Sequence, residues 1–379
     1  MKLYSVVMRL LSVLLIFIPQ VRARLVFERK NGSDPHATKF RTPADLAFEF
    51  SSEGEFQQVM PLISDALAAG KKIELMYFSP SVEKGVSELC EKHPENLRAL
   101  RYPLLTGGFL NWMTSRKLIL VRYDLFPDIL SYTGELMMVW VTFKKERSRG
   151  RGVSSWKKQF LRRATTIIYA TADDAREGNA MGFPGYTFDF RIEQIRRRLL
   201  EKEEKFARMF PEYKTLGFEG YPREKRLILG NAWPSDLVLL ESIPEDYFIL
   251  VVPHKLEPEI LLAFEKHLGK RAVILNKKGV LCELYSDFGR AYVGGGFETS
   301  IHSVLEPLIS GADQISCGPL NHRSTEFDIT KSAGKMTVVK NSQEFTRWLH
   351  SELVSESGDG KIETLSSGYV NFRKAIISC

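Results

Sequence analysis

The chain of 379 residues contains only four cysteines, and these lie far apart, with no Cys-x-x-Cys pair and no Cys/His spacing typical of zinc ligands. This scarcity argues against a disulfide scaffold and a structural zinc site, and it suits a reducing compartment. The sequence also lacks internal repeats and low-complexity tracts. Its longest apolar run, residues 10–18, is about half of the ~20 residues that a helix needs to cross a bilayer. A composition of 44% hydrophobic and 26% charged residues is that of a globular protein, which excludes a disordered chain or a polytopic membrane protein.

Basic residues are concentrated in two places, and the first is the amino terminus, where residues 1–30 carry six basic residues and one acid. Two interpretations of the apolar run 10–18 compete: a secretory signal peptide and a retained, shallowly inserted helix. The small residues of a cleavage site are missing, and arginines follow the run. We therefore expect a short membrane-anchor helix over residues 1–24, with Arg22 and Arg24 at the lipid surface and the body of the protein in the cytoplasm.

The second basic concentration is Lys144–Arg163, with nine basic residues and one acid. Such a stretch binds nucleic acid or acidic lipid, or it is a solvated face without a ligand. The interleaved aromatic residues Trp156 and Phe160 are compatible with either ligand. Because its charge has the same sign as that of the amino terminus, an anionic membrane is favoured over nucleic acid. The residues expected at that surface are Arg149, Arg151, Lys157 and Lys158.

Short apolar runs of strand type alternate with helical patterns along most of the chain. Continuous apolar strands that alternate with helices indicate parallel sheets covered on both faces. The strands form two series, separated by a long charged helix, Ile192–Phe210, and an expected linker, Pro211–Lys225. We therefore predict an α/β protein with two facing, doubly wound, Rossmann-like domains and a cleft between them. Their expected ranges are 25–210 and 211–379.

In open parallel sheets, ligands bind beyond the carboxyl ends of the strands, where helix N-termini present N–H groups to anions. In the first half, Glu55 follows a strand and a glycine turn and is expected in the first turn of a helix. Helix-start glutamates are common, so this position alone is weak evidence for catalysis. Asp124 occupies the equivalent edge after another strand, where it acts at the site or as an ordinary loop residue.

Three loops of the second half reach the expected ligand edge. The most informative runs from Tyr292 through Gly294, Gly295 and Gly296 to Pro307, where glycines allow backbone amides to approach a phosphate. It lacks the lysine of a P-loop and the spacing of a Rossmann fingerprint. We expect a helix capped by Thr299 or Ser300, with His302 and Glu306 on one helix face and able to address one ligand. The other two loops supply the remaining donor-site candidates, His254, Lys255, Asn231 and Trp233.

Together these segments resemble the Kdo transferase family, GT-B glycosyltransferases that attach 3-deoxy-D-manno-octulosonic acid (Kdo) to lipid A precursors in the lipopolysaccharide biosynthesis of Gram-negative bacteria. The resemblance covers most of the chain in order, and it rests on Ser52–Phe56, Phe78–Ser81, Tyr123–Pro127, Phe188–Arg191 and, most specifically, Tyr292–Pro307.

The resemblance implies an inverting transfer of Kdo from CMP-Kdo, with Glu55 as general base, at the cytoplasmic face of the inner membrane. It places phosphate and sugar carboxylate at the Gly294–Ser300 loop and Lys255, and it assigns the ribose hydroxyls to Glu306. CMP-Kdo and a lipid A precursor would be substrates, and no metal or other cofactor is expected. The chain departs from the family pattern at Ser303, at His254-Lys255 and at Gly230–Ala232.

Two alternatives remain open on the sequence alone. A GT-B transferase or epimerase that uses a uridine nucleotide would share Glu306 and the glycine loop, but it would not need Glu55. A non-catalytic relative would bind lipid or partners without turnover.

Overall fold

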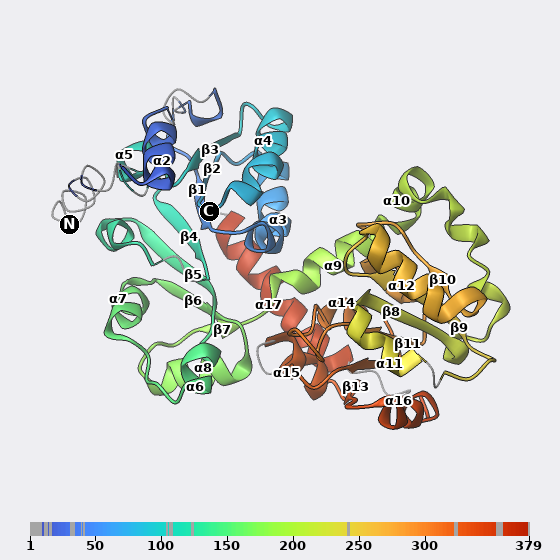
Figure 1. Cartoon of the computed structure of the whole chain (residues 1–379). Helices are drawn as coiled ribbons and strands as arrows, with labels where there is room; N and C mark the ends of the chain where they lie inside the picture. Colours follow the sequence, from blue (N-terminus) through green and yellow to red (C-terminus); the bar gives the residue numbers. More distant parts are fainter. Residues whose placement is uncertain are drawn as a thin grey trace. The chain divides into compact units, whose positions relative to one another are not determined.

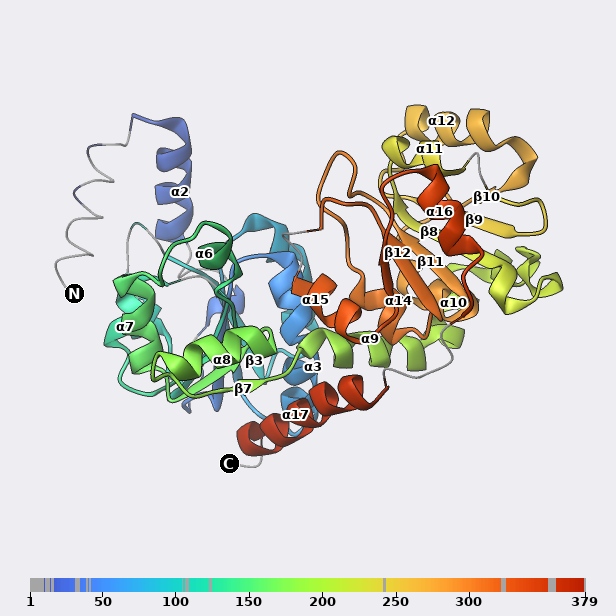
Figure 2. The ribbon, with the colours of Figure 1, turned by 90° about the horizontal axis from the view of Figure 1, so that it is seen from below.

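The computed structural model describes residues 10, 14, 17–30, 35–38, 40, 42–103, 105, 109–122, 125–240, 243–321, 325–353 and 359–377. The chain divides into two compact units, Met1–Arg191 with Ser367–Cys379 and Ile192–Ser366. Each unit contains one sheet with helices on both faces (Figures 1 and 2). The prediction of two Rossmann-like α/β domains is therefore confirmed.

The first unit is built on a seven-stranded sheet of order β3-β2-β1-β4-β5-β6-β7, in which every neighbouring pair is parallel. Strands such as β1 are buried along their whole length, because helices cover both faces of the sheet. The strands are β1 (Leu46–Phe50), β2 (Ile73–Tyr77), β3 (Leu97–Arg101), β4 (Lys117–Val121), β5 (Glu135–Val141), β6 (Thr166–Tyr169) and β7 (Tyr186–Thr187).

Two hydrophobic cores lie on the two faces of this sheet. One contains apolar residues of α3, α4 and α17, and the other those of α5 and α7. The carboxy-terminal helix α17 belongs to the first core through Tyr369, Phe372 and Ile376. The helices are α2 (Pro19–Lys30), α3 (Glu53–Ala68), α4 (Glu83–Lys92), α5 (Phe109–Trp112), α6 (Lys144–Ser148), α7 (Ser155–Arg163), α8 (Ala172–Ala180) and α17 (Asp359–Ile377).

The second unit has a six-stranded parallel sheet of order β10-β9-β8-β11-β12-β13. Helices α9, α10, α13, α14 and α15 contribute to the core on one face, and α11, α12 and α16 to the core on the other. The strands are β8 (Arg226–Ala232), β9 (Phe248–Pro253), β10 (Val273–Ile274), β11 (Arg290–Val293), β12 (Gln314–Cys317) and β13 (Met336–Val338). The helices are α9 (Phe190–Leu200), α10 (Lys202–Met209), α11 (Leu237–Leu240), α12 (Pro258–Leu268), α13 (Leu281–Leu284), α14 (Leu305–Ile309), α15 (Thr325–Ser332) and α16 (Ser342–Leu349).

The structure corrects the predicted domain boundaries. The units divide at Arg191/Ile192 rather than at 210/211, because Ile192, Ile195 and Phe206 lie in the core of the second unit. The expected linker 211–225 consists of short 3-10 turns whose Phe218 is buried in the same core. The single long helix expected over Ile192–Phe210 is two helices, α9 and α10, interrupted at Glu201.

Among the described residues, none of the helices is both long enough and apolar enough to span a bilayer. Most of the expected anchor helix, residues 1–9, 11–13 and 15–16, lies outside the described residues. Its expected end at residue 24 falls inside α2, and Leu25 and Glu28 of that helix are buried.

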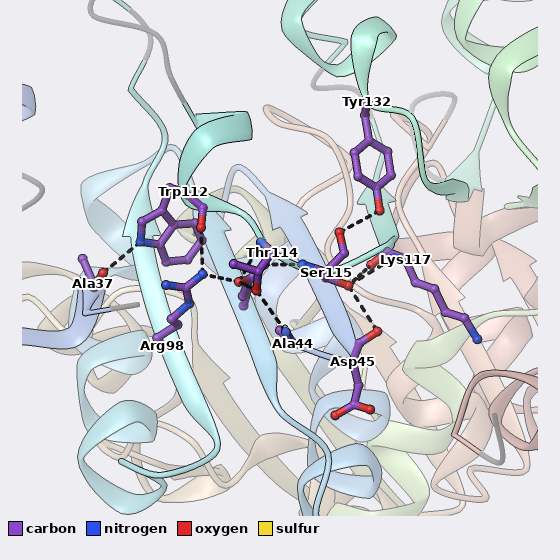
Figure 3. A network of polar contacts seen from close by, with 10 residues as sticks. Ala37, Ala44, Asp45, Arg98, Trp112, Thr114, Ser115, Lys117 and Tyr132 are labelled. Carbon is purple, nitrogen blue, oxygen red and sulfur yellow. Dashed lines mark hydrogen bonds and ion pairs between the residues drawn. The ribbon is translucent and has the colours of Figure 1, made fainter. Parts of the chain in front are cut away.

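A buried polar network lies near the amino ends of β2 and β3, opposite the edge where ligands are expected (Figure 3). The carboxylate of Glu74 pairs with the guanidinium of Arg98 and accepts hydrogen bonds from Thr114 N (2.9 Å), Thr114 Oγ1 (2.6 Å) and Ser115 N (3.1 Å). Arg98 also donates to the carbonyl oxygen of Trp112 (2.7 Å) and lies over its ring. This network ties the loop before β4 to the neighbouring strands, which is a structural role.

Candidate functional site

Three loops of the second unit meet at the carboxyl edge of its sheet, because parallel strands all end on the same side. The loop after β9 joins the end of β8 through the bond from His254 N to Ala232 O (3.0 Å). The loop after β11 does so through the bond from Gly294 N to Gly230 O (2.8 Å). The structure thus brings together the loops that were predicted to hold the donor.

Three aromatic side chains stack at this edge. The rings of Trp233 and His254 lie 4.8 Å apart between centroids, and those of His254 and His302 lie 4.2 Å apart. The indole Nε1 of Trp233 donates to Nε2 of His302 at 3.0 Å. The Nζ atom of Lys255, an exposed residue, lies 5.8 Å from the centroid of the indole ring. The predicted residues therefore form one surface of stacked rings with a cation beside it.

The glycine loop follows β11, and none of its three glycines leaves room for a Cβ atom. A Cβ atom on Gly294 would lie 2.1 Å from the carbonyl oxygen of Asn231, and one on Gly296 would lie 2.7 Å from Cα of Gly318. Gly296 also has φ of +79°, a left-handed conformation that glycine adopts without strain. Asn231 itself has φ of +53°. The backbone is thus closely packed around the loop, and the N–H groups of its three glycines are bonded to Gly230 O, Asp236 Oδ2 and Thr299 O.

Asp236, which was not predicted, holds this loop in place. Its carboxylate is fully buried and accepts hydrogen bonds from Trp233 N (2.8 Å), the Tyr292 hydroxyl (2.8 Å) and Gly295 N (3.3 Å). Burial raises the pKa of Asp236 to about 6, against the lowering effect of these hydrogen bonds. The one sequence signal was its place three residues after Trp233, where an aspartate closes a turn onto the backbone.

Glu306 lies in the first turn of α14, and its side chain is 24% exposed. Arg198 approaches its carboxylate at 3.4 Å (Nη1 to Oε1) and also pairs with the fully buried Glu283 at 3.0 Å (Nε to Oε1). Burial raises the pKa of Glu306 to about 7, although Arg198 opposes that rise. A carboxylate at this position accepts hydrogen bonds from ligand hydroxyls when it is ionised.

The helix after the glycine loop differs from the prediction. It begins at Leu305 with Val304 as its cap, so neither Thr299 nor Ser300 caps it. His302 consequently lies in the loop and does not share a helix face with Glu306. The reason is the compact turn before the helix, in which Gly296 N donates to Thr299 O (2.8 Å) and Leu320 N to Gly296 O (2.8 Å). Ser300 is half-buried in this turn.

In the first unit, Glu55 lies in the first turn of α3, as predicted. Its Oε2 accepts hydrogen bonds from Ser51 N (2.8 Å) and Ser52 N (3.2 Å), while Ser52 Oγ accepts one from Glu55 N (3.4 Å). This reciprocal arrangement is a capping box, which stabilises the start of a helix. The capping role therefore explains the presence of Glu55 without a catalytic function. Both backbone N–H groups donate to Oε2.

The same edge of the first sheet carries strained backbone. Arg122 after β4 has φ of +68°, and Trp140 in β5 has φ of +61°, conformations that cost non-glycine residues about 1–3 kcal/mol. Trp140 is the extra residue of a β-bulge, since Val139 faces one core and Val141 the other. Its ring centroid lies 3.9 Å from Cζ of Arg122 and 4.2 Å from Cζ of Arg191. The predicted acceptor-site residue Asp124 lies outside the described residues.

Two residues assigned to a lipid surface face inward instead. Lys157 is buried, and its Nζ bonds to Thr142 O (2.6 Å) and Glu146 Oε1 (3.0 Å). Arg24 pairs with Glu28 (2.6 Å) and donates to the carbonyl oxygen of Tyr102. Both corrections have the same cause, because the long side chain reaches an internal acceptor that a count of charges does not reveal.

The other four predicted surface residues differ in exposure. Arg22, Arg149 and Arg151 are exposed, and Lys158 is half-buried. In the part of the chain that the structure describes, no group of three or more His, Cys, Asp or Glu side chains could hold a metal ion.

No protein-family model matches the chain, and no curated protein matches its sequence. Solved structures do match. The UDP-GlcNAc 2-epimerase from Methanocaldococcus jannaschii is 12% identical, with a TM-score of 0.59 over 86% of this chain and 99% of that one. The enzyme of that name from Neisseria meningitidis, bound to UDP-GlcNAc, is 11% identical, with a TM-score of 0.56 over 88% and 93%.

A further match is the C-terminal CMP-Kdo binding domain of WaaA from Acinetobacter baumannii, at 13% identity over 47% of this chain and 95% of that one. Its TM-score of 0.31 is too low to support an argument. The two epimerase structures have the GT-B fold. At this level of identity the likeness establishes the fold of the chain and not its reaction.

Proposed function

We propose that this chain is an enzyme that uses a nucleotide sugar and binds the nucleotide at the carboxyl edge of the second sheet. The observation that carries the proposal is the meeting there of the glycine loop and the Trp233–His254–His302 stack, with Glu306 in the first turn of the helix that follows the loop. Each of these serves a different part of a nucleotide. Lys255, beside the closely approachable glycine loop, suits phosphate, an aromatic surface suits a base or sugar ring, and an ionised carboxylate suits ribose hydroxyls.

A uridine nucleotide is the first candidate donor. The two solved structures with TM-scores above 0.5 described here are both UDP-GlcNAc 2-epimerases, and one of them holds UDP-GlcNAc. The second candidate is CMP-Kdo with a lipid A precursor as acceptor, which the resemblance of Tyr292–Pro307 favours. Both candidates require the same phosphate and ribose contacts, so the base and the sugar distinguish them.

Calorimetric titration of the full-length protein with UDP, CMP and GDP tests the nucleotide site. We expect one pyrimidine nucleotide to bind at least about tenfold more tightly than GDP, a difference of about 1.4 kcal/mol. If none of the three binds to a folded wild-type protein, the proposal is wrong. Product masses after incubation with UDP-GlcNAc, or with CMP-Kdo and a tetra-acylated lipid A precursor, then identify the reaction.

The role of Glu55 separates a transferase from the alternatives. We propose that Glu55 removes the proton from an acceptor hydroxyl in a transfer reaction, with Oε1 as the accepting atom. Glutamine also completes a capping box, so Glu55→Gln keeps the helix start but removes the base. A transferase should lose about 10²–10⁴-fold in turnover while nucleotide affinity stays unchanged.

Glu344→Gln is the matched control, because Glu344 holds the equivalent position in α16 and accepts a bond from Lys340 N (2.9 Å). Equal loss of activity in both variants would contradict the role of Glu55 as base. Full activity of Glu55→Gln would favour a reaction that needs no base in the first unit.

We further propose that the protein works at an anionic membrane surface, at the cytoplasmic face of the inner membrane, through residues 1–24 and the exposed Arg149 and Arg151. Phe17 supports this, because 90% of it is exposed although it is a large apolar residue. Sedimentation with vesicles that contain phosphatidylglycerol, compared with neutral vesicles, tests the proposal. Deletion of residues 1–24 should reduce the bound fraction, and unchanged binding would contradict the anchor.

A further inference from the structure

The bond between Trp233 and His302 determines which nitrogen of the histidine carries a proton. The indole N–H is a donor only, and it points at Nε2 of His302 over 3.0 Å. Nε2 must therefore be unprotonated, and the proton of a neutral imidazole is on Nδ1. Turning the ring by half a rotation would replace Nε2 with a carbon atom, and the bond would be lost.

The surroundings of His302 favour the neutral ring. The titratable ring of His254 stacks on the ring of His302, and the indole of Trp233 occupies the position next to Nε2. Burial, with His254 as a second cause, lowers the pKa of His302 to about 4. His254 itself has a lowered pKa, first through burial and then through Lys255 and Lys278, which Glu257 opposes. The pair therefore stays uncharged at neutral pH.

The protonated nitrogen remains available to a ligand. Among the described residues, Nδ1 of His302 has no hydrogen-bond partner. It is also not among the fully buried side-chain atoms without a partner, so part of its surface is accessible. The backbone of His302 is tied to the glycine loop by its N–H, which donates to Gly294 O (3.4 Å). A neutral N–H donor therefore lies beside the glycine loop, at the edge of the sheet where the nucleotide phosphate is proposed to bind.

We propose that Trp233 is a positioning residue that fixes His302 as the Nδ1–H tautomer, so that His302 donates a neutral hydrogen bond to a phosphate oxygen of the bound nucleotide. The inference rests on the proposed nucleotide site. It goes beyond that site because it assigns a tautomer, a direction of donation and a role for Trp233 other than stacking. In water the Nε2–H form of histidine is the more common one, so the structure selects the rarer form.

Nitrogen NMR of the full-length protein labelled with ¹⁵N-histidine tests the tautomer without any ligand. The seven histidines are resolved by their two nitrogen shifts, and loss of one signal pair in His302→Gln assigns His302. We expect a protonated Nδ1 and an unprotonated Nε2 from about pH 5.5 to about pH 8, since the ring stays neutral there. In Trp233→Phe we expect a shift toward the Nε2–H form and a titration closer to that of an ordinary histidine.

Titration with UDP and CMP then connects the tautomer to binding. Loss of one directed hydrogen bond should weaken binding in Trp233→Phe by about three- to tenfold. Trp156→Phe is the matched control, because Trp156 lies in the first unit and donates to Leu125 O (3.0 Å); it should bind like the wild type. An Nε2–H form of His302 in the wild type would overturn the inference, as would unchanged binding by Trp233→Phe. If the wild type has the Nδ1–H form but binds neither nucleotide, the proposed function fails, while the assigned tautomer stands.

Discussion

Replacement of Asp236 by asparagine should change the stability of the second unit in a way that depends on pH. Asp236 has no exposed surface, and no cation pairs with its carboxylate among the described residues; its partners are two N–H groups and a hydroxyl. Asparagine has nearly the same shape and retains one acceptor oxygen, but it cannot ionise. The comparison therefore isolates the free energy of holding a buried charge behind the glycine loop.

The magnitude follows from the shifted pKa. The pKa of Asp236 is about 6 in the folded protein, against 3.8 for an ordinary aspartate. A carboxyl group with the higher pKa in the folded state binds its proton more tightly there, so stability is lost as the pH rises from 3.8 through 6. A shift of roughly two units corresponds to about 3 kcal/mol. The wild type should therefore lose about 3 kcal/mol relative to Asp236→Asn between about pH 4 and pH 7.

Urea titrations of both full-length proteins at several pH values measure this difference at the transition of the second unit. Other titrating groups are common to both proteins, so they cancel in the difference. A difference that is constant with pH, or one that grows in favour of the wild type as the pH rises, would refute the reasoning. It would mean that the three hydrogen bonds to the carboxylate outweigh its burial.

Three further predictions concern the buried network, the glycine loop and Glu306. Glu74→Ala should destabilise the first unit by about 3–5 kcal/mol, because it leaves the buried Arg98 without its partner; urea unfolding measures this, and a loss below about 1 kcal/mol would contradict it. Gly294→Ala should abolish nucleotide binding, since its Cβ would lie 2.1 Å from a carbonyl oxygen, whereas Gly220→Ala, with open space around it, should bind normally in the same calorimetric titration. Nucleotide affinity of the wild type should rise as the pH passes about 7 and Glu306 loses its proton, and Glu306→Gln should remove that dependence; a pH profile shared by both proteins would exclude Glu306 as its source.

Most of the fold follows from sequence pattern, and the exceptions have local causes. The strands β1, β2, β8 and β9 can be recognised in the sequence as apolar runs because both of their faces are buried. β3 is harder to recognise in the sequence, since its Arg98 looks like a surface residue although Glu74 on the neighbouring strand neutralises it. The domain boundary was misplaced because α9 is rich in charge, although its Ile192 and Ile195 pack into the second core.

The sequence predicted the parts of the candidate site that depend on backbone conformation. It did not predict the parts that depend on contacts between residues far apart in the chain. Consecutive glycines after a strand indicate a close backbone approach, and the structure has that approach at Gly294 and Gly296. Arg198 gave no comparable signal, because its contact with Glu306 joins residues 108 positions apart. The stack of His302 on His254 likewise depends on how three loops meet, which a one-dimensional pattern does not contain.

The shifted ionisation constants at the edge of the second sheet support a functional site more strongly than any single residue there. Asp236, His254, His302 and Glu306 all have pKa values moved toward the neutral form, in each case chiefly by burial. Burying such groups in their charged form reduces stability, and groups with shifted pKa values cluster at functional sites. Glu283 provides the contrast, because its equally buried carboxylate has a lowered pKa with Arg198 and Lys205 as partners. Glu283 therefore has two cations as partners, whereas Glu306 shares Arg198 with it, and Asp236 beside the glycine loop has no cation partner among the described residues.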